Sequence, residues 1–195
     1  MSTPTFKLTV DGIDLTLVEF DGIEELNRLF KYTFKTEIPS PAKKLADVID
    51  GDAIFTIVEF DTSLHSGNIE IPGYISKASK TNNEWVLEFR PKLKKTTTNS
   101  RSEIYFKEDA SLSALTVIQS EFDNDIYLSD RAPVFDITST LPKRKLFCQF
   151  HESNWNYVAR LCDHWGFHFY FDHYNNQIVF ADNDQYDQKF TTQLK

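Results

Sequence analysis

The chain has 195 residues, 41% hydrophobic and 26% charged, which is close to the average of globular domains and excludes a disordered or fibrous protein. Its formal net charge of −8 disfavours binding to the phosphate backbone of nucleic acids. No apolar run approaches the ~18 residues needed to span a bilayer, and Met1 to Phe6 lack a signal-peptide pattern, so we expect synthesis in the cytoplasm.

The first 90 residues are predicted to form about six β-strands. The 17 Phe, 8 Tyr and 3 Trp favour strands, because flat side chains pack well on a pleated sheet. Asp11-Gly12 is typical of a tight hairpin turn, since both residues tolerate a positive φ. Leu45, Val48 and Ile49 predict one short helix before Gly51. The expected strands are 6–20, broken at the turn, 32–38, 53–60, 69–76 and 85–89, the pattern of a small antiparallel barrel or sandwich.

The next segment is predicted to be a linker followed by an amphipathic helix. Lys92, Lys94 and Lys95 precede a polar run at 96–100, which favours a solvated loop over a basic patch for an acidic partner. Ser111 is a candidate N-cap for a helix with the apolar positions Leu112, Leu115, Ile118 and Phe122. We therefore expect a first barrel-like domain at 1–95, this linker and helix at 96–145, and part of a second domain at 146–195.

Residues 146–180 predict a strand, a helix and a hairpin that pack together. Ser153 is a good N-cap and Gly166 supplies the C-terminal stop. Between them, one apolar stripe is formed by Val158, Leu161, Cys162 and Trp165. One face of the following strand is aromatic, with Phe167, Phe169 and Phe171 alternating with His168 and Tyr170. Asn175-Asn176 can turn the chain back into a strand at 178–180.

This segment resembles the signature of the VgrG family, the spike proteins of type VI secretion systems. The motif Cys-Gln-Phe-His-Glu-Ser at 148–153 resembles the strand and helix start of that signature, and weaker matches lie at 51–53, 87–93 and 102–106. The residues that carry the resemblance, as elements of the fold, are Glu152, Ser153, Tyr157, Arg160, Leu161, Gly166, Phe169, Tyr170 and Phe171. His151, Asn154 and 163–165 depart from the pattern, which leaves a phage tail hub or late-control protein of the same superfamily as an alternative.

The resemblance implies a β-rich α+β fold with two barrel-like tube domains and short flanking helices. It further implies a homotrimeric hub that caps a hexameric tail-tube protein, contacts baseplate components and carries effector proteins. In such proteins a needle-like β-helix follows in the same chain and punctures the target membrane, and the machine exports the whole hub. We accordingly interpret the present chain as part of a longer one, with a structural role and no cofactor.

An enzyme is the rival class, with His151, His164, His168, His173 and the two cysteines as its raw material. Neither a zinc-binding spacing nor a hydrolase or nucleotide-binding motif is present, so we predict no metal site and no catalytic residue. We interpret Cys148 and Cys162 as unbridged core thiols. The aromatic strand at 167–171 could stack the bases of a single-stranded nucleic acid, but the net negative charge opposes that reading.

Overall fold

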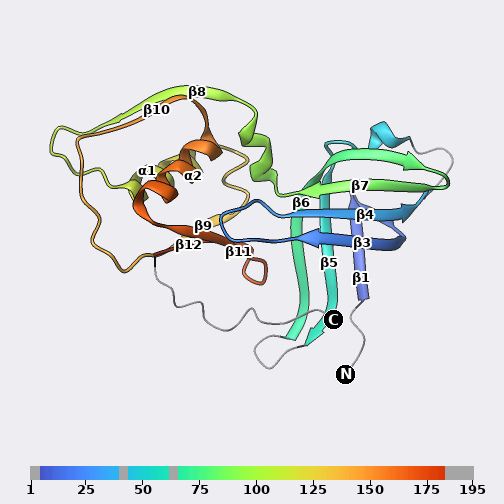
Figure 1. The fold of residues 1–195 in the computed structure, drawn as a ribbon. Helices are drawn as coiled ribbons and strands as arrows, with labels where there is room; N and C mark the ends of the chain where they lie inside the picture. The colour runs from blue at the N-terminus through green and yellow to red at the C-terminus, as the bar shows by residue number, and fades with distance from the viewer. Residues whose placement is uncertain (1–4, 40–43, 62–65, 183–195) are drawn as a thin grey trace.

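The computed structural model describes residues 5–39, 44–61 and 66–182, and has two parts that lie side by side (Figure 1). The N-terminal part is a seven-stranded antiparallel sheet. The C-terminal part contains two helices, a two-stranded ribbon and a three-stranded sheet. The predicted β-rich α+β class is therefore confirmed.

The seven-stranded sheet has the order β2-β1-β5-β6-β7-β4-β3. Its strands are β1 (Thr5–Val10), β2 (Ile13–Leu15), β3 (Leu17–Ile23), β4 (Lys31–Glu37), β5 (Asp52–Asp61), β6 (Ser66–Thr81) and β7 (Glu84–Arg90). The predicted hairpin between β1 and β2 is confirmed, with positive φ values of 47° at Asp11 and 76° at Gly12. The predicted short helix is a single 3₁₀ turn, η1 (Leu45–Asp47).

The two edges of this sheet approach each other because the sheet curls. The edge strands β2 and β3 are separated along the chain by Thr16 alone. Phe6 of β1 and Phe20 of β3 meet across the gap, with ring centroids 4.8 Å apart. Within the described residues no strand pairing joins β3 to β1 or β2, so the hydrogen-bonded ladder is open. A closed barrel in each half remains a prediction.

The C-terminal part consists of three layers joined by short connections. The ribbon pairs β8 (Ser100–Phe106) with β10 (Leu146–Ser153), and the small sheet has the order β11-β12-β9. Its strands are β9 (Ala132–Asp136), β11 (His168–Asp172) and β12 (Gln177–Ala181), with β12 parallel to β9. The helices are α1 (Ala114–Asn124) and α2 (Asn154–Trp165), and they lie between the ribbon and the small sheet in Figure 1.

The prediction of a solvated loop after β7 is wrong. Residues Lys92–Thr97 form a 3₁₀ helix, η2, in which Leu93 and Thr96 are buried. A 3₁₀ helix repeats every three residues, so these two side chains fall on one face, which packs into the core. The lysines lie around that face, and Lys95 pairs with Asp50 at 2.7 Å. Lys92 pairs with Asp52 and Asp130, so Lys92 and Lys95 anchor a structured connection between the two parts.

Helix α1 begins two residues later than predicted. Its N-cap is Ser113, whose hydroxyl accepts a hydrogen bond from the backbone N–H of Thr116 at 3.2 Å. Leu112 forms a β-bridge with Arg144, which holds the preceding backbone extended and delays the helix start. Leu112, Ile118 and Phe122 are buried as expected, whereas Leu115 is half-buried.

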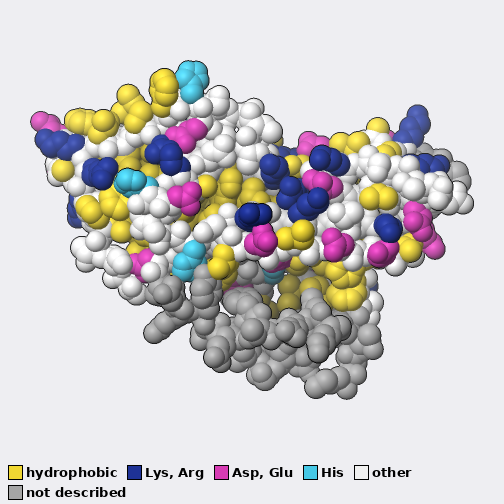
Figure 2. Space-filling view, viewed as in Figure 1, with side chains coloured by type: hydrophobic (Ala, Val, Ile, Leu, Met, Phe, Trp, Pro, Cys, Tyr) yellow, Lys and Arg dark blue, Asp and Glu magenta, His cyan; other side chains and the backbone are white. Residues whose placement is uncertain are grey.

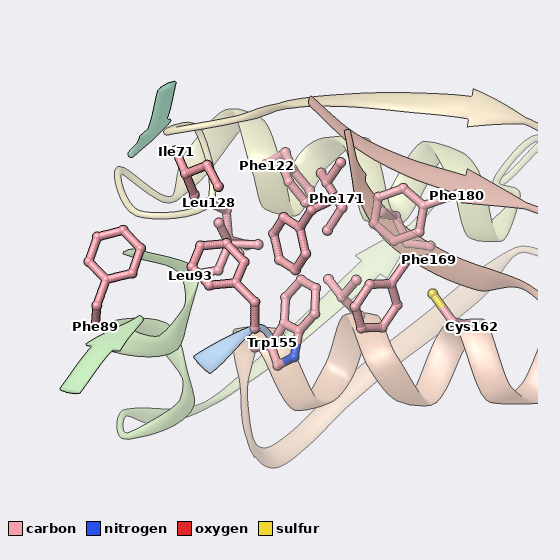
Figure 3. Close-up of a cluster of buried hydrophobic side chains, with 14 of the residues drawn as sticks. Ile71, Phe89, Leu93, Phe122, Leu128, Trp155, Cys162, Phe169, Phe171 and Phe180 are labelled. Carbon is pink, nitrogen blue, oxygen red and sulfur yellow. The ribbon is translucent and has the colours of Figure 1, made fainter. Parts of the chain in front are cut away.

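A single hydrophobic cluster runs through both parts of the molecule. In Figure 3, Ile71 and Phe89 of the large sheet lie near Leu93 and Leu128, while Phe122, Trp155, Phe169, Phe171 and Phe180 come from the C-terminal part. Because the core is continuous, the two parts are packed rather than merely tethered. The boundaries at residues 95 and 145 stay a prediction.

Candidate functional site

The α2 helix carries the caps that the sequence predicted. The Ser153 hydroxyl accepts a hydrogen bond from the backbone N–H of Asn156 at 3.2 Å, and Gly166 ends the helix with φ 74° and ψ 27°. Glycine suits this left-handed position because it has no Cβ to clash. Val158, Leu161 and Cys162 are buried as expected, while Trp165 is half-buried beneath the guanidinium of Arg144.

Glu152, Tyr157 and Arg160 fasten α2 to the ribbon. Arg160 donates to the Glu152 carboxylate, with an Nη2–Oε1 distance of 2.5 Å, and to the carbonyl of Cys148 at 3.1 Å. The same guanidinium lies 5.1 Å from the centre of the buried Tyr157 ring. Tyr157 in turn stacks on Tyr105 of β8, with ring centroids 6.1 Å apart. These three residues hold one helix against one strand pair.

The aromatic strand β11 joins α2 to the large sheet. Phe169 packs edge-on against Trp155 of α2 at 5.0 Å between ring centroids. Phe171 packs edge-on against Phe30 at 4.9 Å. Tyr170 lies on the opposite, half-buried face of the strand. The stacked bases of a nucleic acid could not reach Phe169 or Phe171, because both rings are already buried in the core.

A polar network crosses the junction between the two parts and was not predicted. Asn27 and Phe169 exchange two hydrogen bonds, from the Asn27 N–H to the Phe169 carbonyl at 3.0 Å and from the Phe169 N–H to the Asn27 side chain at 2.8 Å. The Glu24 carboxylate accepts from the Tyr32 hydroxyl and lies 2.7 Å from Nε2 of His173. Burial on its own raises the pKa of Glu24, but His173, Tyr32 and Arg131 together outweigh burial and leave that pKa below its usual value.

Arg131 is the central charge of this junction and is 1% exposed. Its guanidinium lies 5.6 Å from the ring centre of Phe30 and 5.2 Å from that of Phe171, and donates to the carbonyl of Pro72 at 3.2 Å. Burial lowers the pKa of Arg131 to about 10, so the group stays charged at neutral pH. A buried cation between two aromatic rings fixes their spacing. The junction is therefore built for rigidity.

A second polar cluster lies beneath the ribbon. The fully buried Glu121 of α1 accepts hydrogen bonds from Nη2 of Arg101, at 2.8 and 3.0 Å, and from the hydroxyl of Tyr105. Gln149, also fully buried, accepts from Nε of Arg101 at 3.2 Å and donates to the carbonyl of Glu152 at 2.9 Å. Burial, and then the hydrogen bond to Glu121, raise the pKa of Tyr105. This cluster ties α1 to β8 and β10.

An open cleft of about 610 Å³ lies where the two parts meet. Its lining includes Arg28, Lys31, Arg90, Lys94, Glu25 and Trp155. Figure 2 shows Lys and Arg side chains gathered at this place near the middle of the molecule. Three of the basic side chains already face carboxylates, because Arg28 pairs with Glu25, and Lys31 and Arg90 with Glu88. Lys31 and Arg90 share one carboxylate, so four basic side chains face two acidic ones and the cleft keeps a net positive charge.

The residues considered for catalysis are dispersed. His164 lies in α2 and His168 in β11, on either side of the helix stop at Gly166. Within residues 5–39, 44–61 and 66–182, no three His, Cys, Asp or Glu side chains are grouped so that they could hold a metal ion. In the same residues, no helix has the length and apolar character required to traverse a bilayer.

The two cysteines are free thiols in different environments, and the interpretation of both as core residues is wrong for Cys148. In β10 the side chains of Phe147 and Gln149 point inward, so the alternation of the strand places Cys148 outside. Cys162 is buried, and burial raises the pKa of its thiol to about 12. The structure thus makes one thiol accessible and protects the other.

A maleimide at neutral pH is expected to label Cys148 alone in the folded protein. The thiolate is the reactive form, and Cys162 has almost none at neutral pH besides lacking solvent contact. Mass spectrometry should show one adduct before denaturation and two after it. Rapid double labelling of the folded chain would contradict the burial of Cys162.

The comparison with protein families decides which class the fold belongs to. Residues 23–193 match the family model of the phage tail baseplate hub (GPD). The chain belongs to this baseplate hub family. The match begins at the last residue of β3, so it leaves out β1 and β2 but includes β4 to β7, the junction network and the whole VgrG-like segment. This match confirms the predicted resemblance to VgrG proteins and phage tail hubs. The family is a structural one.

Solved structures share the fold of this hub chain at low sequence identity. An E. coli type VI secretion component, described as similar to the bacteriophage T4 tail proteins gp27 and gp5, matches with a TM-score of 0.72 and 20% identity over 91% of this chain and 49% of its own. A tail protein from Neisseria meningitidis MC58 gives 0.63 and 12%, over 92% and 50%. A chain of the Francisella PdpA–VgrG complex gives 0.57 and 11%, over 96% and 33%.

The hub chain spans about half the length of the first two of these structures. At such identities the likeness shows the fold alone. A search of curated protein sequences gave no match. The role of the nine signature residues as a family signature stays a prediction, although the structure places eight of them at helix caps, ion pairs or the packed core.

Proposed function

We propose that this chain is the hub portion of a type VI secretion spike or a related contractile injection machine. The observation that carries the proposal is the family match over residues 23–193, together with the shared fold of the type VI secretion component and the phage tail protein. In this role three copies of the chain form a ring that caps the hexameric tail tube. The hub contacts baseplate components and carries effectors, and a following needle punctures the target membrane.

Several features of the described residues support a mechanical role. The two parts share one core, and their junction is fixed by a buried cation, two hydrogen bonds at Asn27 and a hydrogen bond between Glu24 and His173. A rigid junction suits a hub protein that transmits mechanical force. The curled seven-stranded sheet supports the proposal that each half serves as a barrel-like tube domain.

A phage tail or baseplate hub is the second candidate, because phage tail proteins share the fold at a similar coverage. A metal-dependent or cysteine hydrolase has less support, since Cys162 is buried with a raised pKa and the exposed Cys148 thiol donates to the backbone carbonyl of Gln149 rather than to a histidine. We propose that the hub acts without catalysis or cofactor. We also propose that it is made in the cytoplasm and leaves the cell through the machine.

Sedimentation velocity of the natural full-length protein tests the proposal. We expect a species of three times the monomer mass that binds purified tail-tube protein at one end. The fragment 1–195 run beside it shows how much of the assembly resides in the hub portion, because a missing needle can supply trimer contacts. A full-length protein that is monomeric, or that forms a stable two-fold dimer, would contradict the hub role.

A further inference from the structure

The β8–β10 ribbon has an apolar outer face that the other described residues leave open. Phe106 stands opposite Leu146, and Ile104 opposite Cys148, so these four side chains share one face of the ribbon. Phe150 extends the row, and we call these five residues the outer ribbon face. The exposed fractions are 66% for Ile104, 63% for Phe106, 52% for Leu146 and 72% for Phe150. Figure 2 shows hydrophobic side chains gathered along this upper edge, over β8 and β10 of Figure 1.

The outward position of Phe150 continues the alternation of β10, in which Phe147 and Gln149 are buried while Leu146 and Cys148 are exposed. The register shifts between Gln149 and Glu152, where His151 has a positive φ of 48° and donates its N–H to the Ser102 hydroxyl at 3.2 Å. Such bulges re-aim side chains. Here the bulge turns His151 outward beside Phe150, with 5.0 Å between the two ring centroids, and Ser153 beyond it is buried again. The face is thus a built feature of the strand and does not result from fraying.

The size of the outer ribbon face fits one side of a protein interface. A large apolar side chain has a surface of roughly 200 Å², so the four residues with the exposed fractions given above present on the order of 500 Å² to solvent. A standard interface buries about 800 Å² on each partner, of which about three fifths is apolar. A two-stranded ribbon is also marginally stable by itself and benefits from cover on its second face.

The net negative charge of the chain restricts which surfaces of two copies can meet. Each copy of the chain carries a formal charge of −8, so two copies repel unless they meet through a surface without acidic groups. The outward-pointing positions of β8 and β10 hold Ser100, Ser102, His151 and the five residues of the outer ribbon face, none of them acidic, while the exposed Glu103 stands opposite the buried Gln149 on the other side of the ribbon. Other exposed large apolar residues, such as Val18, Ile49 and Ile126, are spread over separate elements.

We propose that the outer ribbon face is covered by a second copy of this chain in the assembled hub. The proposal rests on the proposed function and specifies which surface makes the contact between neighbouring copies. In a three-fold ring the contact is heterologous, so the face meets a different surface of the next copy.

Cys148 lies within the outer ribbon face, and the other thiol of residues 1–195, Cys162, is buried. Labelling of the peptide that contains Cys148, followed by mass spectrometry, therefore measures whether the face is covered. The experiment measures the rate of maleimide labelling of the full-length wild-type protein across a range of concentrations, beside its sedimentation. We expect labelling of Cys148 to slow about tenfold or more as the assembly forms.

Ile104→Lys should raise the concentration for half-assembly at least about tenfold and restore fast labelling of Cys148. The lysine also makes the chain less negative, so weaker assembly cannot be attributed to added net repulsion. Ile126→Lys is the matched control, since Ile126 is 77% exposed and lies beyond α1, outside the face. Both variants should retain the circular dichroism and melting temperature of the wild type, because both side chains are exposed.

The outcomes separate this proposal from the hub role. A trimer in which Cys148 is labelled as fast as in the monomer, or an Ile104→Lys variant that assembles like the wild type, overturns the contact and leaves the hub intact. Slow labelling only after tail-tube protein is added would assign the face to that partner instead. Ready formation of a Cys148–Cys148 disulfide would support the face as a contact between copies but contradict a three-fold ring. A protein that never assembles overturns both.

Discussion

Leu161→Ala is expected to lower the free energy of unfolding by about 2–5 kcal/mol. Leu161 is 3% exposed on the buried face of α2 and belongs to the cluster that joins both parts of the molecule. Truncation removes apolar burial and leaves a cavity that the surrounding aromatic side chains cannot easily fill. Chemical denaturation at neutral pH measures the change from the shift in midpoint.

Asp163→Ala is the matched control on the same helix. Asp163 is exposed, so we expect a change within about half a kcal/mol. A loss below that limit for Leu161→Ala itself would mean that the apolar stripe of α2 is not packed as described.

Glu121→Ala is expected to cost about 2–4 kcal/mol. Removing one partner of a buried ion pair costs about 3–5 kcal/mol, and we reduce this because the Arg101 side chain remains 37% exposed and can regain water. The substitution also leaves the hydroxyl of Tyr105 without its carboxylate acceptor. Thermal or chemical unfolding measures the loss, with Asp123→Ala, an exposed site on the same helix, as the control.

Two further measurements distinguish a lost ion pair from a simple cavity at Glu121. Because the hydrogen bond to Glu121 is a cause of the raised pKa of Tyr105, second to burial, Glu121→Ala should lower that pKa in an ultraviolet absorbance titration. The double substitution Arg101→Met with Glu121→Leu should recover part of the stability, since apolar residues can replace a buried pair. An unchanged Tyr105 titration would contradict the described network.

The sequence predicted the features that depend on a few neighbouring residues. Asp11-Gly12 encodes its turn through the positive φ that both residues accept, and Ser153 and Gly166 encode the two ends of α2. Such signals act within one turn of chain, so no distant partner can easily override them. The family resemblance rests on the same segment, and the family match over residues 23–193 confirms it.

The predictions failed where burial depends on distant partners. Cys148 was expected in the core, yet its neighbour Gln149 is buried instead, because Arg101, 48 residues away, satisfies the amide. The linker after β7 was expected to be solvated, yet Leu93 is fully buried. Strands β8 and β9 were not predicted. Their residues carry no clear strand pattern, and they are held extended by pairing with β10 and β12.

By itself, then, the sequence determined the β-rich class, the hairpin turns, the capped helix and the hub-like signature, since turn and cap chemistry is local. Only the tertiary structure decided how the two halves are joined. The bond between Asn27 and Phe169 links residues 142 apart, and that between Glu24 and His173 links residues 149 apart. Neither pair carries a local pattern, because residues so far apart in the chain come within hydrogen-bond distance only when the whole fold brings them together.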